Sequence, residues 1–415
     1  MLAEFRPILG KKGFSYLWIS QILSQITINL TNFLLLIRLF NTTGSTIATS
    51  LLWISYALPA ILIGPVGAAV TDMIDRRKML IITNLLQSLV ILIYALTFER
   101  TIFLTYGVAI TYSLLNQFYV PAEAASLPAL IEKKHLPSAN VLFFMTQQGS
   151  IILGFLAAGI LNHFFGFSTT LFIASTLLFF AFVSVNFLPK LLPSEKIPKS
   201  FEEGIFNFFG RIFEGYNFIK EERTVLIPFL LLLGFQIMMA TILINVPIMI
   251  ISILKMSVNT GIIYVVISAV CGAIVGSLIV GRLLRLRVRK KVVIENSLAL
   301  LALAIFLLVF LVPELKTISR FLFGAGALFL AGFSAIGIII PAQTFLQEKT
   351  PGGLRGRVFG NFWFLATIAT VFPVLFSGAI SELFGIRLLL FGISMLLVVA
   401  FWFSRKHSQK LMEAS

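Results

Sequence analysis

The chain has 415 residues, of which 58% are hydrophobic and only 12% are charged, and its mean hydropathy is +1.00. A soluble domain carries roughly 25% charged residues because it needs a polar surface, so this composition excludes a soluble globular protein. The formal net charge is +15. Because no soluble basic domain is present to bind it, nucleic acid is not an expected partner.

Apolar runs that are long enough to cross a bilayer recur along the whole sequence. A spanning helix needs roughly 20 apolar residues, and the strands of a β-barrel would alternate in polarity, which these runs do not. The sequence therefore predicts an all-α membrane protein with twelve transmembrane helices. The predicted spans are residues 14–39, 46–70, 79–98, 102–120, 138–162, 168–188, 225–252, 258–281, 292–312, 317–345, 357–381 and 386–404.

One long polar stretch, from Pro189 to Thr224, divides these spans into six and six. We expect an N-terminal six-helix half at residues 1–188, a cytoplasmic linker at 189–224 and a C-terminal six-helix half at 225–415. Within the linker, apolar residues recur at helical spacing from Phe201 to Ile219. This spacing predicts an amphipathic helix that lies on the membrane surface.

The distribution of basic residues predicts the orientation of the chain. If the N-terminus is cytoplasmic, 26 of the 32 basic residues lie at cytoplasmic ends of spans and 6 lie on the other side. Cytoplasmic loops carry such an excess of Lys and Arg. We therefore expect a multi-pass protein of the cytoplasmic (inner) membrane with both termini in the cytoplasm.

The two halves repeat the same features. Pro121-Ala122 after the fourth span matches Pro341-Ala342 after the tenth, and the second and eighth spans both carry small residues, such as Gly64 and Gly272. Two six-helix repeats that share one orientation are typical of membrane transporters. In such proteins the substrate site lies between the two halves, near the middle of the bilayer. For any single glycine, ordinary helix packing is the simpler interpretation.

Three segments resemble motifs of the major facilitator superfamily. The segment GPVGAAVTDMIDRRK, from Gly64 to Lys78, resembles the signature loop of that superfamily. The segment FLQEKTPGGLRGRVFG, from Phe345 to Gly360, resembles a loop of its macrolide and siderophore exporters. The segment SIILGFLAAG, from Ser150 to Gly159, is similar to its antiporter motif but lacks the proline, and Pro373 stands at about the equivalent place in the eleventh span.

This resemblance implies a major facilitator fold, with spans one, four, seven and ten around a central cavity. It implies a gating loop, in which Asp72 latches the outward-open state against the start of span eleven. The gating-loop candidates are Gly67, Asp72, Arg76, Arg77, Arg355, Gly356 and Arg357. The helix-packing candidates are Gly154, Gly159 and Pro373.

Polar stripes mark the predicted cavity. On the first span the stripe runs from Gln21 to Asn32, and on the fourth it runs from Tyr112 to Glu123, at helical spacing. The alternative interpretation is hydrogen bonding between helices, which contributes about 0.6 kcal/mol on average. The substrate-cavity candidates are Gln21, Ser24, Gln25, Asn29, Asn32, Tyr112, Asn116, Tyr119 and Gln236.

All 17 acids lie in tails, in loops or near the ends of spans. A proton-coupled carrier needs a titrating group whose exposure changes with conformation, and Glu123, toward the cytoplasmic end of the fourth span, is the best candidate. The alternative interpretation is an interfacial acid that pairs with a nearby lysine.

We expect a monomeric secondary transporter that exports a bulky, partly apolar small molecule, with protons as the candidate coupling ion. Alternatives are an importer, a facilitated carrier, a lipid flippase, or a non-transporting sensor or assembly factor. No phosphate-binding Gly-Lys-Ser/Thr loop and no metal-ligand spacing occur in the sequence, so neither an enzyme nor a cofactor is expected.

Overall fold

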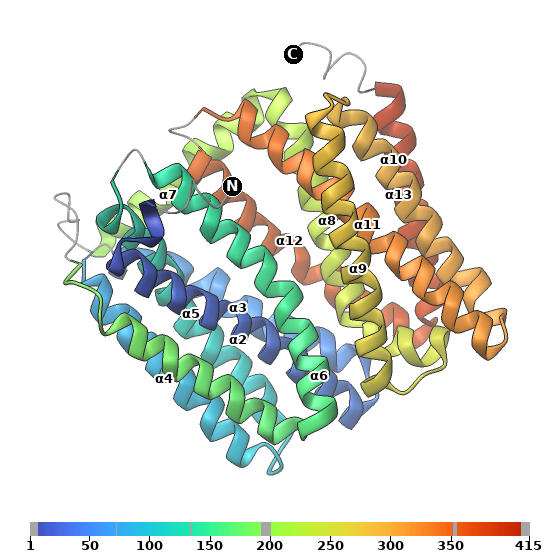
Figure 1. The fold of residues 1–415 in the computed structure, drawn as a ribbon, viewed down its shortest axis with the longest axis horizontal. Coiled ribbons are helices and arrows are strands. Elements are labelled where there is room, and N and C mark those ends of the chain that lie inside the picture. The colour runs from blue at the N-terminus through green and yellow to red at the C-terminus, as the bar shows by residue number, and fades with distance from the viewer. Residues whose placement is uncertain (1–6, 72, 133–134, 192–200, 352–354, 408–415) are drawn as a thin grey trace. The chain divides into compact units, whose positions relative to one another are not determined.

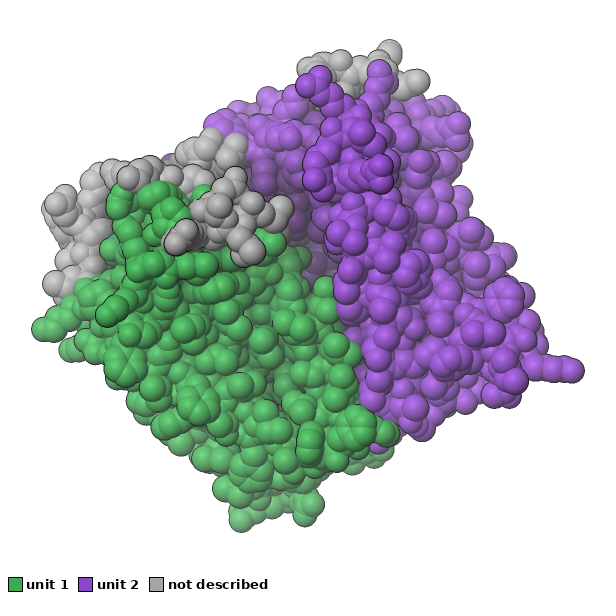
Figure 2. Space-filling model, in the orientation of Figure 1, with its two compact units in different colours: residues 1–42, 54–210 green, residues 43–53, 211–415 purple. Residues whose placement is uncertain are grey.

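The computed structural model of the chain describes residues 7–71, 73–132, 135–191, 201–351 and 355–407, and within these ranges it contains helices and no strand (Figure 1). The chain forms two compact units (Figure 2). Unit 1 comprises residues 1–42 and 54–210, and unit 2 comprises residues 43–53 and 211–415. Residues 43–53 therefore group with unit 2, whereas the apolar runs alone place them in the N-terminal half.

Unit 1 is built from long helices that begin close to the predicted boundaries, and only the last residue of α2, Thr43, and the first residues of α3, up to Trp53, belong to unit 2. They are α2 (Lys12–Thr43), α3 (Thr46–Thr71), α4 (Arg76–Thr97), α5 (Phe103–Leu130) and α6 (Leu136–Val185).

Helix α6 has 50 residues and contains a break at Gly166, where φ is 79° and ψ is 171°. Glycine adopts such a backbone conformation without the steric cost that a Cβ atom would add. An unbroken helix of this length would extend about 75 Å, far more than the roughly 30 Å of hydrocarbon in a bilayer. The break at Gly166 therefore divides α6 into two spans.

Unit 2 consists of the remaining helices, several of which end in irregular turns. They are α7 (Phe201–Glu221), α8 (Arg223–Met249), the π-helix η2 (Ile250–Leu254), α9 (Val258–Arg285), α10 (Lys290–Phe306), the π-helix η3 (Leu307–Leu311), the 3-10 helix η4 (Val312–Glu314), α11 (Thr317–Lys349), α12 (Arg355–Leu383) and α13 (Ile386–His407). Helix α7 begins in unit 1 and ends in unit 2.

The predicted fold class is confirmed. Among the described residues, ten helices are long and apolar enough to cross a membrane. Helix α6 is one of them and supplies two spans, and α5 adds 28 helical residues, so a helix coincides with each of the twelve predicted spans. One detail is corrected: Pro121 and Pro341 lie inside α5 and α11 rather than after them, because membrane helices tolerate proline where neighbouring groups satisfy the freed backbone.

Glycines allow equivalent pairs of helices to approach closely in the two units. In unit 1, a Cβ atom on Gly67 of α3 would overlap with the carbonyl oxygen of Gln117 on α5. In unit 2, a Cβ atom on Gly272 of α9 would overlap with the carbonyl oxygen of Phe329 on α11. The second and fourth spans of each half are therefore packed backbone to backbone, as small residues in membrane helices permit.

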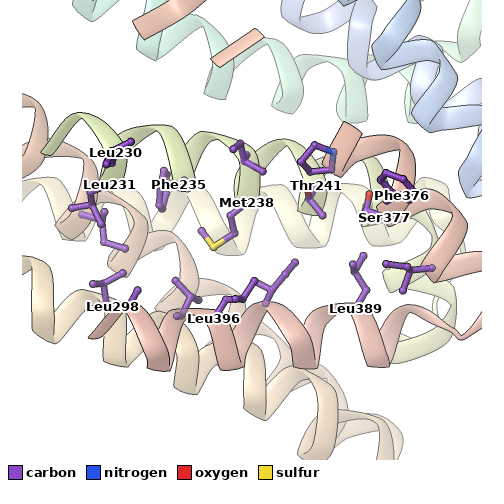
Figure 3. A pocket seen from close by; sticks show the side chains of 18 residues that line it. Leu230, Leu231, Phe235, Met238, Thr241, Leu298, Phe376, Ser377, Leu389 and Leu396 are labelled. Carbon is purple, nitrogen blue, oxygen red and sulfur yellow. The ribbon is translucent and has the colours of Figure 1, made fainter. Parts of the chain in front are cut away.

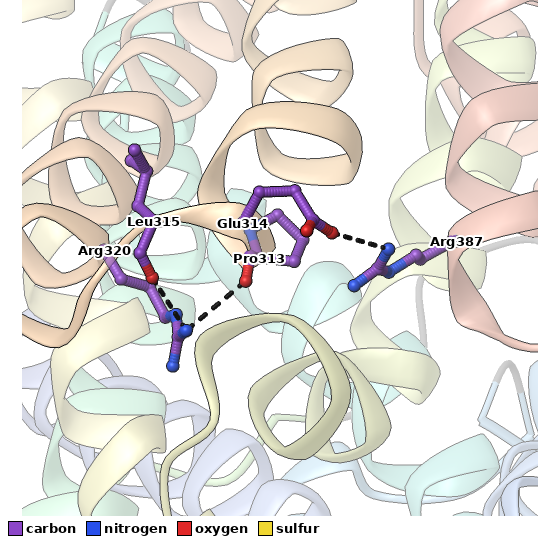
Figure 4. A network of polar contacts seen from close by, with 5 residues as sticks. All are labelled: Pro313, Glu314, Leu315, Arg320 and Arg387. Carbon is purple, nitrogen blue, oxygen red and sulfur yellow. Dashed lines mark hydrogen bonds and ion pairs between the residues drawn. The ribbon is translucent and has the colours of Figure 1, made fainter.

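A polar network fixes the turn between η4 and α11 in unit 2 (Figure 4). The guanidinium group of Arg320 donates hydrogen bonds to the carbonyl oxygens of Pro313 at 3.3 Å and Leu315 at 2.7 Å. Arg387 at the start of α13 forms an ion pair of 3.2 Å with Glu314. Backbone groups at this turn are thereby satisfied by side chains rather than by a regular helix.

Candidate functional site

A buried polar cluster in unit 1 contains several of the predicted site residues. The hydroxyl group of Tyr119 on α5 donates a hydrogen bond of 2.7 Å to the carboxyl group of Glu123. The hydroxyl of Ser24 on α2 lies 2.9 Å from the same Tyr119 oxygen, and that of Ser20 lies 3.5 Å from it. Asn84 on α4 donates to Ser20 at 3.1 Å. We call these five residues the Tyr119 cluster; it joins three helices of unit 1.

Glu123 is a buried acid whose hydrogen-bond donor is uncharged. Its exposed fraction is 6%, and that of Tyr119 is 1%. An ionised carboxylate at such a position is costly unless it is paired or hydrated. The group that donates to its carboxyl oxygen is a phenol hydroxyl, not a cation. The site can therefore hold the neutral acid readily and the anion only at a cost, which is what a group that takes up and releases a proton requires.

Several buried polar atoms of α2 and α4 belong to residues of the Tyr119 cluster or to residues a few positions from its members in the sequence. Both side-chain polar atoms of Gln87, the carbonyl oxygen of the Asn84 side chain and that of Gln21 are buried without a partner among the described protein atoms. Buried polar groups are normally hydrogen-bonded. The described residues of α2 and α4 therefore keep unused hydrogen-bonding capacity inside unit 1.

The residues of the predicted stripe on α2 differ in burial. Gln21 and Ser24 are buried, and Gln21 donates to the backbone oxygen of Phe143 on α6 at 3.2 Å. Gln25, Asn29 and Asn32 are half-buried. The N-terminal part of the stripe is therefore packed, and the residues from Gln25 to Asn32 remain partly accessible.

Tyr56 on α3 is a site residue that the sequence analysis did not identify. Its hydroxyl accepts a hydrogen bond of 3.3 Å from Asn116 on α5 and is also hydrogen-bonded to Asn32 on α2. Tyr56 thus links the two predicted stripes. In the sequence Tyr56 is one of several hydroxyl-bearing residues of the second span, such as Ser50 and Ser55, so no signal there distinguishes it.

The remaining cavity candidates, Tyr112 and Gln236, are not members of the Tyr119 cluster. Tyr112 is 3% exposed within unit 1. Gln236 is half-buried on α8 of unit 2. Tyr112 therefore belongs to unit 1 and Gln236 to unit 2.

The gating candidates in unit 1 include two anchored arginines. Arg76 donates to the backbone oxygen of Ala125 at 3.0 Å, and Arg77 donates to that of Asn186 at 2.6 Å. They tie the start of α4 to α5 and to the end of α6. Gly67 belongs to the close α3–α5 contact described above.

Asp75, which was not a candidate, caps α4 at this place. Its carboxylate accepts hydrogen bonds from the backbone N–H groups of Arg77 at 3.0 Å and Leu191 at 3.2 Å. Asp72 lies outside the described residues. Arg355, Gly356 and Arg357 begin α12, but their side chains are outside the described part of the chain.

The helix-packing candidates have separate surroundings. A Cβ atom on Gly154 of α6 would lie 2.6 Å from the Cβ atom of Asn29 and 3.0 Å from the backbone oxygen of Ile26, both on α2. Gly159 is buried. Pro373 lies within α12 of unit 2 and lines a pocket there.

A polar contact in unit 2, also missed from the sequence, joins the start of α3 to α12. Thr46 donates to the backbone oxygen of Gly378 at 2.7 Å, and Ser50 donates to that of Val374 at 3.0 Å. A Cβ atom on Gly378 would overlap with the hydroxyl of Ser50. We call this the α3–α12 contact.

Glu382 and Thr370 extend the α3–α12 contact at its two ends. The carboxylate of Glu382 accepts hydrogen bonds from the hydroxyl of Ser45 at 2.7 Å and from the backbone N–H of Ile47 at 3.2 Å. It thereby satisfies a free N–H group in the first turn of α3. Trp53 donates to Thr370 at 3.3 Å.

An apolar pocket of about 560 Å³ lies among helices of unit 2 (Figure 3). Side chains of α8, such as Phe235 and Met238, face side chains of α13, such as Leu396, across it. Helix α12 contributes Phe376 and Ser377. We call this pocket the apolar slot.

Membrane-spanning helices, a buried polar cluster in unit 1 and an apolar slot in unit 2 are features of a polytopic membrane transporter. The comparisons with known proteins specify it further. A sequence model of the Major Facilitator Superfamily matches residues 17–372. The chain belongs to this superfamily and is a membrane transporter.

Similar proteins agree with this assignment. The uncharacterized MFS-type transporter YfiS of Bacillus subtilis (strain 168) is 26% identical over 358 residues, which are 84% of this chain and 82% of that protein. The solved structure of the nucleoside transporter NupG has a TM-score of 0.69 at 14% identity and covers 94% of this chain and 98% of that one. A second NupG structure, of a mutant, has a TM-score of 0.70 at 17% identity and covers 94% and 99%. At such identities the likeness to NupG shows the fold alone.

Proposed function

We propose that the chain exports a bulky, partly apolar small molecule across the cytoplasmic membrane by alternating access, in exchange for protons. The observation that carries this proposal is the Tyr119 cluster, in which Glu123 is buried and hydrogen-bonded to a neutral hydroxyl. A proton-coupled carrier needs a titrating group at depth whose exposure changes with conformation. The proposed direction is supported by the resemblance of the segment from Phe345 to Gly360 to a loop of macrolide and siderophore exporters.

The half-buried face of α2 supports a substrate that is only partly apolar. Gln25, Asn29 and Asn32 offer amide groups along this face. Phe155 of α6 is half-buried, and its ring stacks on that of the buried Phe33 of α2, with 4.5 Å between ring centroids. Ligand sites combine aromatic and aliphatic lining with a few polar groups that orient the ligand.

Transport in proteoliposomes tests this function. Protein is reconstituted with a pH gradient, and the movement of erythromycin, as a macrolide, and of a catecholate siderophore is measured. We expect accumulation driven by the gradient in at least one case, and none when the gradient is collapsed. In the Glu123→Gln variant we expect loss of the gradient-driven accumulation, whereas substrate exchange between equal concentrations should persist.

A matched control is Glu99→Gln, which removes an exposed acid. It should leave accumulation unchanged. Equal accumulation by the wild type with and without the pH gradient would favour a facilitated carrier. Unchanged gradient-driven transport by Glu123→Gln would remove Glu123 from the coupling mechanism.

A further inference from the structure

Helix α7 carries a row of exposed aromatic side chains. Phe206, Phe213 and Tyr216 are 80%, 62% and 48% exposed, and Phe209 is 39% exposed. Their spacing of i, i+3, i+7 and i+10 places them on one face of the helix. We call these four residues the aromatic stripe. Contiguous exposed apolar surface of this kind marks a site of interaction.

The stripe differs from two other faces of α7. Gly215 and Ile219 lie one helical turn apart and are buried, so their face packs on the protein. Glu203, Glu214 and Glu221 are exposed. They share a third face, because the intervals between them are close to whole numbers of helical turns. The aromatic stripe is therefore neither the packing face nor the acidic face of the helix.

Two connections place the C-terminal half of α7 where membrane spans begin. Only Glu222 separates α7 from α8, whose span begins at Thr224. The side-chain amide of Asn361 on α12 donates a hydrogen bond of 2.8 Å to the backbone oxygen of Ile212. Asn361 lies in the first turn of the span Val358–Leu383. Both the end and the middle of α7 are thus attached to the first turn of a spanning helix.

These two attachment points lie at a similar depth in the membrane. Helices α8 and α12 coincide with the seventh and eleventh predicted spans, which begin on the same side because both are odd-numbered. The part of α7 between Ile212 and Glu221 is about 14 Å long, and it belongs to unit 2. A helix that joins two points of similar depth runs along the membrane surface instead of crossing the bilayer.

The bilayer surface is the partner that this position offers to the stripe. A surface helix buries its apolar face about 5–10 Å into the boundary between headgroups and acyl chains. Glu202 and Lys220 lie one turn before and one turn after the stripe, so it ends at charged residues. Helix α7 has four acids and two basic residues and therefore a net charge of −2. Burial of apolar surface, rather than attraction to anionic lipids, is the force available to hold it.

We propose that the aromatic stripe inserts into the bilayer leaflet on the side where α8 and α12 begin, without requiring anionic lipid. Through the hydrogen bond between Asn361 and Ile212, α7 then holds the start of α12 at the membrane surface. The gating candidates Arg355, Gly356 and Arg357 begin α12, so this attachment connects the lipid surface to the predicted gate. The inference does not depend on export or on proton coupling.

EPR spectroscopy of the full-length protein in phosphatidylcholine nanodiscs tests the insertion. In a Cys271→Ala background, a nitroxide is attached to Phe213→Cys or, as the matched control, to Glu214→Cys on the acidic face. Molecular oxygen concentrates in the bilayer, and a hydrophilic nickel complex stays in water. We expect the ratio of oxygen to nickel accessibility to be severalfold higher at position 213 than at position 214. Equal ratios would overturn the proposal, as would insertion that occurs only after phosphatidylglycerol is added.

Labels at the two ends of the stripe test how the helix lies. Phe206→Cys and Tyr216→Cys are labelled separately, so each variant keeps the other three rings. Because a helix in the plane of the surface holds its stripe at one depth, we expect both positions to give the high oxygen ratio found at position 213. A high ratio at one end and the ratio of position 214 at the other would mean that α7 leaves the surface, which would contradict the proposal.

Hydrogen–deuterium exchange in the same nanodiscs tests the attachment to α12. Replacement of both Phe206 and Phe213 by Ser should weaken insertion, and we expect faster exchange in α7 and also in the first turns of α12. Asn217→Ser, at an exposed position of α7 outside the stripe, is the control and should leave both segments unchanged. Faster exchange in α7 alone would overturn the attachment, and unchanged exchange in both segments would overturn the insertion.

Discussion

At the residue scale, the Tyr119 cluster combines what the sequence could and could not predict. Tyr119 and Glu123 are four residues apart, so one helix face brings them together, and the sequence predicted both as site residues. Ser20, Asn84 and Tyr56 were not predicted. Each hydrogen-bonds to a residue of a different helix, and such pairings depend on tertiary packing that spacing along one helix does not specify.

The hydrogen bond between Tyr119 and Glu123 predicts a stability change. Tyr119→Phe leaves the buried carboxyl group of Glu123 without its donor, which should lower the free energy of unfolding by about 1–3 kcal/mol. Thermal unfolding in detergent measures this. Adding Glu123→Met should recover part of the loss, because removing both partners costs less than removing one. Tyr216→Phe, at an exposed tyrosine of α7, is the control, and an equal loss in the control would refute the assignment.

The difference in burial along the α2 stripe predicts that cysteines at its positions are labelled at different rates. In a Cys271→Ala background, which removes the exposed native cysteine, Gln25→Cys and Asn116→Cys should react with a sulfonated maleimide. Gln21→Cys should react far more slowly, because Gln21 is 4% exposed. Labelling of purified protein is followed by mass spectrometry. Complete protection of all three cysteines would favour helix packing as the role of the whole stripe.

At the element scale, the apolar runs located the helices well, because each run long enough to span hydrocarbon must satisfy its own backbone hydrogen bonds. Prolines misled the prediction of one helix end. The fourth span was predicted to end at residue 120, yet α5 continues through Pro121 and Pro128 to Leu130. The break at Gly166 lies between two predicted spans, but nothing in the apolar pattern shows that the helices on either side abut there without a loop.

The backbone contacts of Gly67 and Gly272 predict the effect of side chains at these positions. Gly67→Leu and Gly272→Leu should each lower the free energy of unfolding by at least about 1–3 kcal/mol, because the new side chain overlaps with a carbonyl group of the adjacent helix. Thermal unfolding in detergent measures the loss. Gly107→Leu, where a Cβ atom meets nothing within 4 Å, should be tolerated. Tolerance of Gly272→Leu to the same degree would contradict the close α9–α11 contact.

At the scale of the whole molecule, twelve inserted spans would cross the membrane an even number of times and leave both termini on the same side. The sequence predicted this from the length of the apolar runs and from the distribution of basic residues, and neither requires knowledge of the fold. It could not predict that residues 43–53 group with unit 2. That grouping depends on hydrogen bonds between Thr46, Ser50 and residues more than 300 positions later in the chain.

The basic residues predict on which side of the membrane the eleventh span begins and the twelfth span ends. Reporter domains fused after Arg357 or after Lys406 should both be cytoplasmic, because 26 of the 32 basic residues fall on that side. Enzymatic reporters that are active on only one side of the membrane measure this in intact cells. A reporter fused after Arg387, on the opposite side, is the control. An external signal from either of the first two fusions would change the number of spans.

The α3–α12 contact also limits how this protein can vary over evolution. A Cβ atom on Gly378 would overlap with the hydroxyl of Ser50 and would lie 2.7 Å from the backbone oxygen of Thr46, and a smaller residue at position 50 would remove only the first of these two overlaps. Glycine at position 378 should therefore persist among relatives even where position 50, 328 residues away, has changed. Most neighbouring positions on the exposed faces of the same helices should change independently.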